Sequence, residues 1–252
     1  MKSLSFCVAK GGTGKTTLTG NIGGELSKHA KTLLIDGDPQ GNLTTWLLTE
    51  PPEYELSDYL GGGVPFDAVS VNVGGYLDIV PTFSVGGGLR SWADTQAAMK
   101  PFAFTELLEA AAQHYTYAIV DLGPGLATFE QTALSAVDEV IGVLLPEMFS
   151  FDGLETLEAT LEEIKRSRRA RFTMDKLVVN RLNRSYATHK LYAEMYEQTK
   201  YTIYPVGQST RLADCPIQHQ TIWEYAPGDK STEEIGKVAW DVMEAEIEKA
   251  RQ

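Results

Sequence analysis

The sequence predicts a doubly wound α/β fold, in which a mostly parallel sheet is flanked by helices on both faces. Continuous apolar runs rich in Val, Ile and Leu are typical of strands that are buried on both faces. Helical patterns separate these runs, and strands that alternate with helices favour right-handed crossover connections. With 252 residues, 43% hydrophobic and 22% charged, the chain can bury a substantial core. A single domain over residues 1–252 is the simplest organisation, because the sequence shows no linker and no internal repeat.

The predicted elements alternate along the chain. Strands are expected at Leu4–Ala9, Thr32–Asp36, Leu77–Pro81, Ala118–Asp121, Val140–Leu145, Lys176–Val179 and Tyr201–Tyr204. Helices are expected at Lys15–His29, Phe104–His114, Phe129–Val137, Gly153–Arg169, His189–Lys200 and Thr232–Ala250.

The first strand leads into a glycine-rich loop, Lys10 to Thr17, that reads KGGTGKTT. A phosphate-binding loop of the P-loop class requires a strand before it and a helix after it, and both are predicted here. Its glycines let the backbone fold around phosphates, and the helix N-terminus adds positive potential. Lys15 is expected to reach the β- and γ-phosphates, and the Thr16 hydroxyl to ligate Mg²⁺. The residues expected to bind the nucleotide here are Gly11, Gly12, Thr13, Gly14, Lys15, Thr16 and Thr17.

Carboxylates end two other predicted strands. Asp36 and Asp38 follow Leu33–Ile35, and Asp121 closes the apolar run that begins at Tyr117. Open α/β sheets bind ligands at the carboxyl ends of their strands. Asp121 is therefore expected to hold Mg²⁺ through water, in the manner of a Walker B aspartate.

Lys10, at the head of the loop, is the signature of a deviant Walker A motif, and with it the sequence resembles the ParA/MinD group of ATPases. The resemblance implies that Lys10 reaches across a nucleotide-sandwich dimer to the partner's phosphates. The DGDPQGN segment, which begins at Asp36, resembles the group's switch I motif. That likeness implies that Asp38 orients the attacking water, while Asp36 supports the phosphate loop or the metal shell.

The resemblance also assigns the base site and exposes one departure. Asn180 matches the asparagine that reads the adenine edge, although a turn residue would look the same, and Pro205 stands where the group has base-contacting backbone. After Asp121 the group more often reads Asp-x-Pro-Pro, whereas Gly123 replaces the first proline here. This glycine is expected to loosen the loop that corresponds to switch II. Arg181 follows Asn180 and is a further candidate for the nucleotide pocket.

The C-terminal third resembles ParA partition proteins in particular. It carries Tyr204-Pro205, then the run RLADCP from Arg211, then the run IWEYAP from Ile222. The likeness is to a short ParA whose first strand opens the chain, so an operator-specific repressor is not expected. It implies a homodimer that forms on ATP, binds DNA non-specifically, and is released by hydrolysis that a ParB-type partner stimulates. A cytoplasmic, nucleoid-associated protein is expected.

Charge is unevenly distributed along the chain, which fits such a role. The formal net charge is −12, yet residues 165–211 hold eleven Lys or Arg and three acids, a net of +8. Such asymmetry suggests a basic face on an acidic body. Arg211 matches a DNA-contacting arginine of the short members, and Arg184 and Lys190 are further candidates. The cluster Lys165–Arg171 is equally well explained as a solvated helix end.

The alternatives fit less well. A MinD-like positioning ATPase shares the loop, but it would need a basic amphipathic C-terminal helix, and this tail is mainly acidic. No membrane partner is expected. Iron proteins of the nitrogenase type bridge a cluster through paired cysteines, whereas Cys7 and Cys215 are isolated and Cys7 is interpreted as a core thiol. A ligase of the dethiobiotin synthetase kind would normally lack Lys10.

Overall fold

Eight strands form one sheet in the computed structural model, which describes residues 1–8, 11–147 and 149–250. The strands lie in the order β3-β4-β2-β5-β1-β6-β7-β8. β3 runs antiparallel to β4, and the other neighbouring pairs are parallel. The predicted α/β class is therefore confirmed. The bounds are β1 Lys2–Cys7, β2 Thr32–Gly37, β3 Val71–Gly74, β4 Leu77–Val80, β5 Tyr117–Leu122, β6 Glu139–Leu144, β7 Lys176–Leu182 and β8 Thr202–Gly207.

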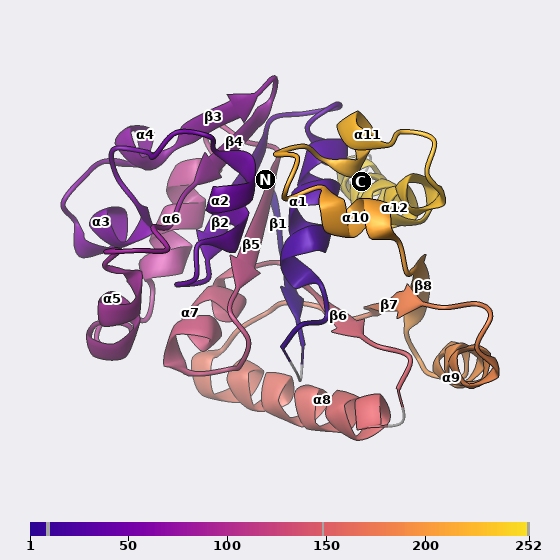
Figure 1. Cartoon of the computed structure of the whole chain (residues 1–252). Coiled ribbons are helices and arrows are strands. Elements are labelled where there is room, and N and C mark those ends of the chain that lie inside the picture. The colour runs from indigo at the N-terminus through magenta and orange to yellow at the C-terminus, as the bar shows by residue number, and fades with distance from the viewer. Residues whose placement is uncertain (9–10, 148, 251–252) are drawn as a thin grey trace.

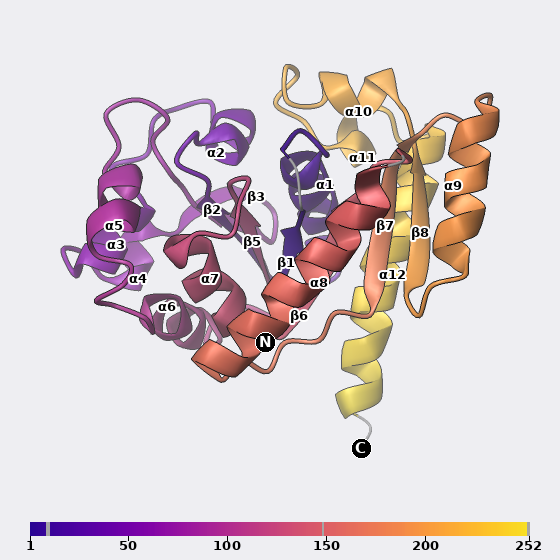
Figure 2. The same cartoon turned by 90° about the horizontal axis from the view of Figure 1, so that it is seen from below.

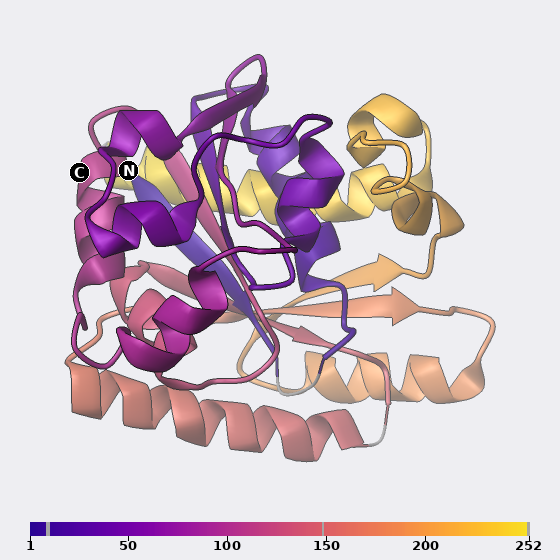
Figure 3. The same ribbon diagram turned by 60° about the vertical axis from the view of Figure 1, so that its left-hand side comes forward.

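Helices cover both faces of this sheet, and Figure 3 shows α8 on the opposite side of the strands from α1 and α12. The predicted long helices are all present, with shorter ones between them. Their bounds are α1 Lys15–Leu26, α2 Asn42–Leu47, α3 Leu56–Gly61, α4 Phe66–Val69, α5 Leu89–Thr95, α6 Ala103–Ala111, α7 Thr128–Ala136, α8 Phe149–Arg168, α9 Ala187–Glu197, α10 Thr210–Asp214, α11 Ile222–Tyr225 and α12 Lys230–Ala250.

The two larger of three apolar clusters lie on the two faces of the sheet. On one face, α6, α7 and α8 supply Leu107, Phe129 and Leu157, which pack with Ile35 of β2. On the other face, side chains of α1 and α12 pack together, with Ile22 among them. Burial of this kind is the main stabilising contribution in a sheet covered on both faces. Cys7, which was predicted to be a core thiol, belongs to the first core. Both Cys7 and Cys215 are buried and free.

The sequence missed one strand and several short helices. β3 is an edge strand with alternating exposure, so it lacks the continuous apolar run that marks the buried strands. The missed helices α2, α3, α4, α5, α10 and α11 have four to seven residues, too few for a helical period to be read. β1 lies at Lys2–Cys7 rather than Leu4–Ala9, and Ala9 is outside the described residues.

The topology brings the carboxyl ends of β1, β2 and β5 together near the middle of the sheet (Figure 1). β5 lies between β2 and β1, and Asp36 of β2 is directly opposite Asp121 of β5. At the two ends of the sheet, α9 lies beside β8, and α3 and α5 lie at the far end (Figure 2). Within the described residues, no helix is long and apolar enough to cross a membrane.

Candidate nucleotide-binding site

The glycine-rich loop joins β1 to α1, as its sequence predicted. Gly14 precedes α1 with a φ of 93°, and Gly12 has a φ of 77°. This left-handed region favours glycine because a Cβ would clash with the backbone. A Cβ at Gly14 would also lie 2.5 Å from Nδ2 of Asn180. The loop therefore needs glycine at position 14 on two grounds. Lys10 lies outside the described residues.

Thr16 and Asp121 meet at the N-terminus of α1. The Thr16 hydroxyl donates to Oδ2 of Asp121 at 2.7 Å, and Thr19 of the next turn lies 3.4 Å from Oδ1. Asp121 is fully buried, and Lys15 is only 8% exposed. The structure thus brings together the two residues that the sequence analysis proposed as metal ligands. Thr19 was missed because no motif marks it.

The Asp36 carboxylate is directed to the segment that follows β2. It accepts from the backbone N–H of Thr44 at 2.8 Å and from the Thr44 hydroxyl at 2.7 Å, and the Asp38 N–H lies 3.3 Å away. Thr82, after β4, donates its N–H to the Thr44 hydroxyl oxygen. Asp36 therefore supports the switch I segment and α2 through Thr44, which the sequence analysis did not identify.

Asp38 stands just beyond the end of β2, next to the loop after β5. Its carboxylate accepts from the Gln40 N–H at 2.9 Å, and it is 8% exposed. A Cβ at Gly123 would lie 3.4 Å from Oδ1 of Asp38, and one at Gly11 would lie 3.5 Å from the Pro124 side chain. The loop that departs from the family pattern at Gly123 therefore still packs beside both Asp38 and the phosphate loop.

Burial governs the electrostatics of these groups. Desolvation, and then the neighbouring Asp121 charge, raise the pKa of Asp36 to about 8. Desolvation also raises the pKa of Asp121 to about 6, although the Thr16 hydrogen bond and the Lys15 charge oppose that shift. Burial lowers the pKa of Lys15, and the charge of Asp121 opposes this. Asp36 and Asp121, at the carboxyl ends of two central strands, thus have too little positive charge nearby to keep both of them ionised. A bound cation would favour their ionised forms.

The donors at this edge fit Mg²⁺. Mg²⁺ prefers hard oxygen ligands and is usually held by one or two carboxylates together with substrate phosphates. Thr16 and Asp121 offer a hydroxyl and a buried carboxylate within hydrogen-bond distance of each other. Among the described residues, no group of three or more His, Cys, Asp or Glu side chains could hold a metal ion on its own. An ion here would accordingly be completed by phosphate oxygens and water.

A pocket of about 240 Å³ lies beside the head of α1. One wall comes from Gly14, Thr17 and Leu18, and the opposite wall from Asn180, Arg181 and residues 207–210, 212 and 213. Asn180 is fixed in this wall, because its Nδ2 donates to the Thr13 carbonyl at 2.7 Å and its Oδ1 accepts from the Arg181 N–H.

A bulge in β7 turns these two residues toward the pocket. The β7–β8 register shifts between Val179 and Leu182, and Arg181 has a φ of 56°. β-bulges redirect side chains and are common next to functional sites. Pro205 lies within β8, paired with Val179, whereas the pocket wall begins at Gly207. The structure thus places Asn180 and Arg181 at the pocket and Pro205 two residues before its wall.

The basic segment is partly neutralised by ion pairs. Lys176 is buried against Glu139 and Asp241, and Arg184 lies 2.8 Å from Glu234. Lys165, Arg166 and Lys200 also have acidic partners. The partners of Lys165 and Arg166 are Glu162 and Glu163 on α8 itself, which favours the interpretation of that cluster as a solvated helix end.

The three candidate DNA contacts are exposed at the surface. Arg184 follows β7, Lys190 lies on α9, and Arg211 lies on α10, where its Nη1 donates to the Tyr225 hydroxyl at 3.3 Å. These elements lie toward the β7–β8 end of the sheet (Figures 1 and 2).

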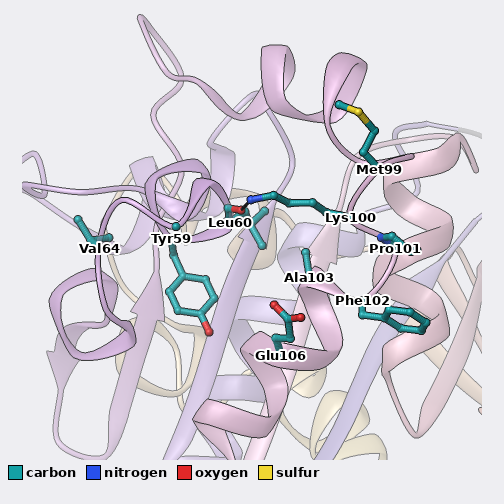
Figure 4. A pocket seen from close by; sticks show the side chains of 10 residues that line it. Tyr59, Leu60, Val64, Met99, Lys100, Pro101, Phe102, Ala103 and Glu106 are labelled. Carbon is teal, nitrogen blue, oxygen red and sulfur yellow. Dashed lines mark hydrogen bonds between the residues drawn. The ribbon is translucent and has the colours of Figure 1, made fainter.

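A second hollow, of about 470 Å³, lies between α3 and the start of α6. Figure 4 shows Tyr59 and Glu106 on two sides of it, with Phe102 and Met99 nearby. Lys100, at its rim, donates to the Leu60 carbonyl at 2.9 Å. Its lining shares no residue with the pocket beside the phosphate loop, so it is not part of the candidate nucleotide site.

Comparison with known proteins agrees with the geometry. Residues 1–174 match a family described as an AAA domain. The chain is 31% identical over 243 residues to the uncharacterized protein BBD21 of Borreliella burgdorferi, covering 94% of this chain and 98% of that protein. It is 32% identical over 191 residues to the chromosome partitioning protein ParA of Caulobacter vibrioides, covering 73% of this chain and 71% of that protein.

Solved structures share the fold. A Cyanothece McdA–ATP complex superposes with a TM-score of 0.83 at 21% identity, covering 96% of both chains. The septum site-determining protein MinD of Pyrococcus horikoshii, complexed with Mg-ADP, gives 0.80 at 19% identity over 96% of this chain and 95% of that one. At these identities the likeness shows the fold alone.

Proposed function

The chain belongs to the ParA-type family of partition ATPases, and on that premise we propose that it is a nucleotide-controlled switch for DNA segregation. ATP binding would drive homodimerisation across the nucleotide faces, and the dimer would hold DNA non-specifically. Hydrolysis, stimulated by a ParB-type partner, would release the DNA. Nucleoid association would follow from such binding.

The observation that carries this proposal is the contact between the phosphate-loop hydroxyl and a buried carboxylate. Thr16 donates to Asp121 at 2.7 Å at the N-terminus of α1, with Lys15 beside them. A helix N-terminus and backbone N–H groups favour phosphate oxygens. The positive charge of Lys15 would stabilise the charge that develops on the transferring phosphoryl group.

Mg²⁺, when bound, would neutralise charge on the β- and γ-phosphates. Thr16 and Asp121 are the residues of this chain that would hold it. Asp38 would orient the attacking water, since its carboxylate lies next to the loop after β5 and is not fully buried. Lys10 would act in trans on the partner's phosphates, as the family resemblance implies.

The base would enter the 240 Å³ pocket between α1 and segment 207–213. Asn180 and Arg181, which line the pocket from β7, would recognise it. Pro205 would act from the neighbouring strand, and Asp36 would act through the switch I segment that it supports.

Asp38→Ala tests the hydrolytic step. We expect this variant to bind ATP and remain on DNA, because only the positioning of water is lost. ATP turnover and retention of the protein on DNA-coated beads would be measured together. Rapid turnover with normal release by the variant would refute the assigned role.

The DNA surface is tested by combining Arg184→Ala with Arg211→Ala. Loss of contacts to phosphates should weaken binding to every DNA sequence. It should also reduce the slope of log K against log[salt] by about one for each lost contact. The matched control, Arg166→Ala with Arg171→Ala, removes the same charge from exposed positions of the basic segment. Equal DNA retention by the two double variants would contradict the assignment.

The second candidate is a MinD-like positioning ATPase that acts on a membrane or a protein cargo. The shared fold with MinD supports considering it. Flotation with vesicles containing anionic lipid, with and without ATP, separates the two functions. Nucleotide-dependent flotation without DNA retention would favour the MinD-like function.

A further inference from the structure

Glu234 of α12 occupies a position that the proposed function does not explain. Its side chain is 6% exposed, although carboxylates are seldom buried without strong partners. One oxygen, Oε2, accepts from the Gly207 N–H at 2.6 Å. The other, Oε1, lies 2.8 Å from Nη1 of Arg184, and Lys230 is farther away at 3.9 Å. One buried carboxylate therefore accepts a hydrogen bond from the last residue of β8 and forms an ion pair with Arg184, a candidate DNA contact.

Gly207 begins the segment that separates two hollows. Residues 207–210 line the 240 Å³ pocket beside Gly14 and Thr17. The same four residues line another hollow, on the side of Arg184, Lys230 and Glu234, which is distinct from the one beside α3 and α6 although its volume is also about 470 Å³. A ligand that fills the first hollow contacts the wall that Glu234 holds from the other side.

Gly207 is close to both partners of this contact. A Cβ at this position would lie 3.2 Å from Oε2 of Glu234 and 3.6 Å from Nη1 of Arg184. The backbone of Gly207 therefore lies close to both charged groups, and a displacement of Gly207 acts on the ion pair through the Glu234 carboxylate to which it donates. Packed contacts of this kind transmit small movements because they cannot deform continuously.

We propose that Glu234 is a positioning residue that couples the nucleotide pocket to the basic surface. Without nucleotide it fixes segment 207–210 and neutralises Arg184. When a nucleotide fills the pocket, segment 207–210 moves away from Glu234 and Arg184 becomes available to a DNA phosphate. Hydrolysis then releases DNA through loss of the ATP-dependent dimer, not through this contact. The inference rests on the proposed function insofar as DNA is the partner of Arg184.

Two substitutions separate the two contacts of Glu234. Glu234→Gln keeps an oxygen that accepts from Gly207 but removes the charge that neutralises Arg184. Glu234→Ala removes both contacts. Glu233→Gln is the matched control, because it makes the same charge change one residue away, where the side chain is exposed and pairs with Lys237.

DNA retention without nucleotide should rise for Glu234→Gln. One released arginine adds about 0.9 to the salt slope, which corresponds to roughly eightfold tighter binding at about 0.1 M salt. With ATP the same variant should match the unmodified chain, because Arg184 is already released. Glu233→Gln should change both states equally. Equal gains in both states for Glu234→Gln would overturn the coupling.

Nucleotide affinity gives a readout that needs no DNA. If filling the pocket breaks the Gly207 contact, Glu234→Ala should bind a fluorescent ADP about fivefold tighter or more, whereas Glu234→Gln should not. Unchanged ADP affinity in a folded Glu234→Ala protein would refute the coupling. If this variant does not fold, the Glu234→Gln comparison decides alone. Failure of the unmodified chain to retain DNA with ATP would instead refute the proposed function.

Discussion

Thr44→Val tests the support of the switch I segment most directly. Valine has nearly the shape of threonine but lacks the hydroxyl, which donates to Asp36 at 2.7 Å and accepts from the Thr82 N–H at 2.8 Å. Both Asp36 and Thr82 are at most 1% exposed, so no water replaces the lost partner. Each buried group left unsatisfied costs about 1–3 kcal/mol. We therefore expect the free energy of unfolding to fall by about 2–4 kcal/mol.

The pH dependence of this loss identifies its origin. Because burial and Asp121 raise the pKa of Asp36 to about 8, its carboxyl group is mostly protonated at pH 6 and ionised at pH 9. Removing a hydrogen-bond donor costs more free energy when the acceptor is ionised, so the destabilisation should be larger at pH 9. Urea denaturation at both pH values measures it. Thr44→Ser keeps the hydroxyl, and Thr45→Val changes an exposed neighbour. A loss below about 1 kcal/mol, or one equal to that of Thr45→Val, would refute the reasoning.

Other residues of the site allow simpler tests. Because the pKa of Asp36 is raised, the folded state binds more protons than the unfolded state between pH 4 and 8. Stability should therefore fall across that window, by up to about 6 kcal/mol, and Asp36→Asn should flatten the dependence of stability on pH in urea denaturation. Gly14→Ala should abolish ADP binding in calorimetry, since its Cβ would meet Asn180, whereas Gly12→Ala, with open space around it, should weaken binding less. Asn180→Ala loses a buried hydrogen bond to Thr13, about 1.4 kcal/mol, and should raise the KM for ATP about tenfold with little change in kcat; an effect confined to kcat would contradict a role in binding.

The parts of the fold that the sequence predicted are those encoded by local pattern. The buried strands can be recognised as apolar runs, and the phosphate loop can be recognised as glycines between a strand and a helix. β3 could not be found in this way, because its four residues alternate between half-buried and exposed and form no continuous apolar run. The contact of Asp36 with Thr44 spans eight residues, and that of Thr44 with Thr82 spans 38. Such contacts depend on which strands become neighbours, which no local spacing records.

The prediction of a basic face depended most on contacts that the sequence does not show. The sequence gives a net of +8 for residues 165–211, which suggests a strongly basic face. Lys176 is counted in that sum, yet it is buried between Glu139 and Asp241. The partners Glu139 and Asp241 come from β6 and α12, outside the segment. Composition counts charges along the chain, whereas the field at the surface depends on partners that folding brings from elsewhere.

The bulge in β7 explains how one short segment can serve two surfaces. In a regular strand, side chains alternate between the two faces of the sheet. The register shift between Val179 and Leu182, with Arg181 at a φ of 56°, interrupts that alternation. As a result Asn180 reaches the Thr13 carbonyl and Arg181 lines the nucleotide pocket, while Arg184 emerges beside Glu234. The phosphate loop, the base pocket and the basic surface are thus joined by five consecutive residues, 180–184, so any movement of the loop would have a short covalent route to Arg184.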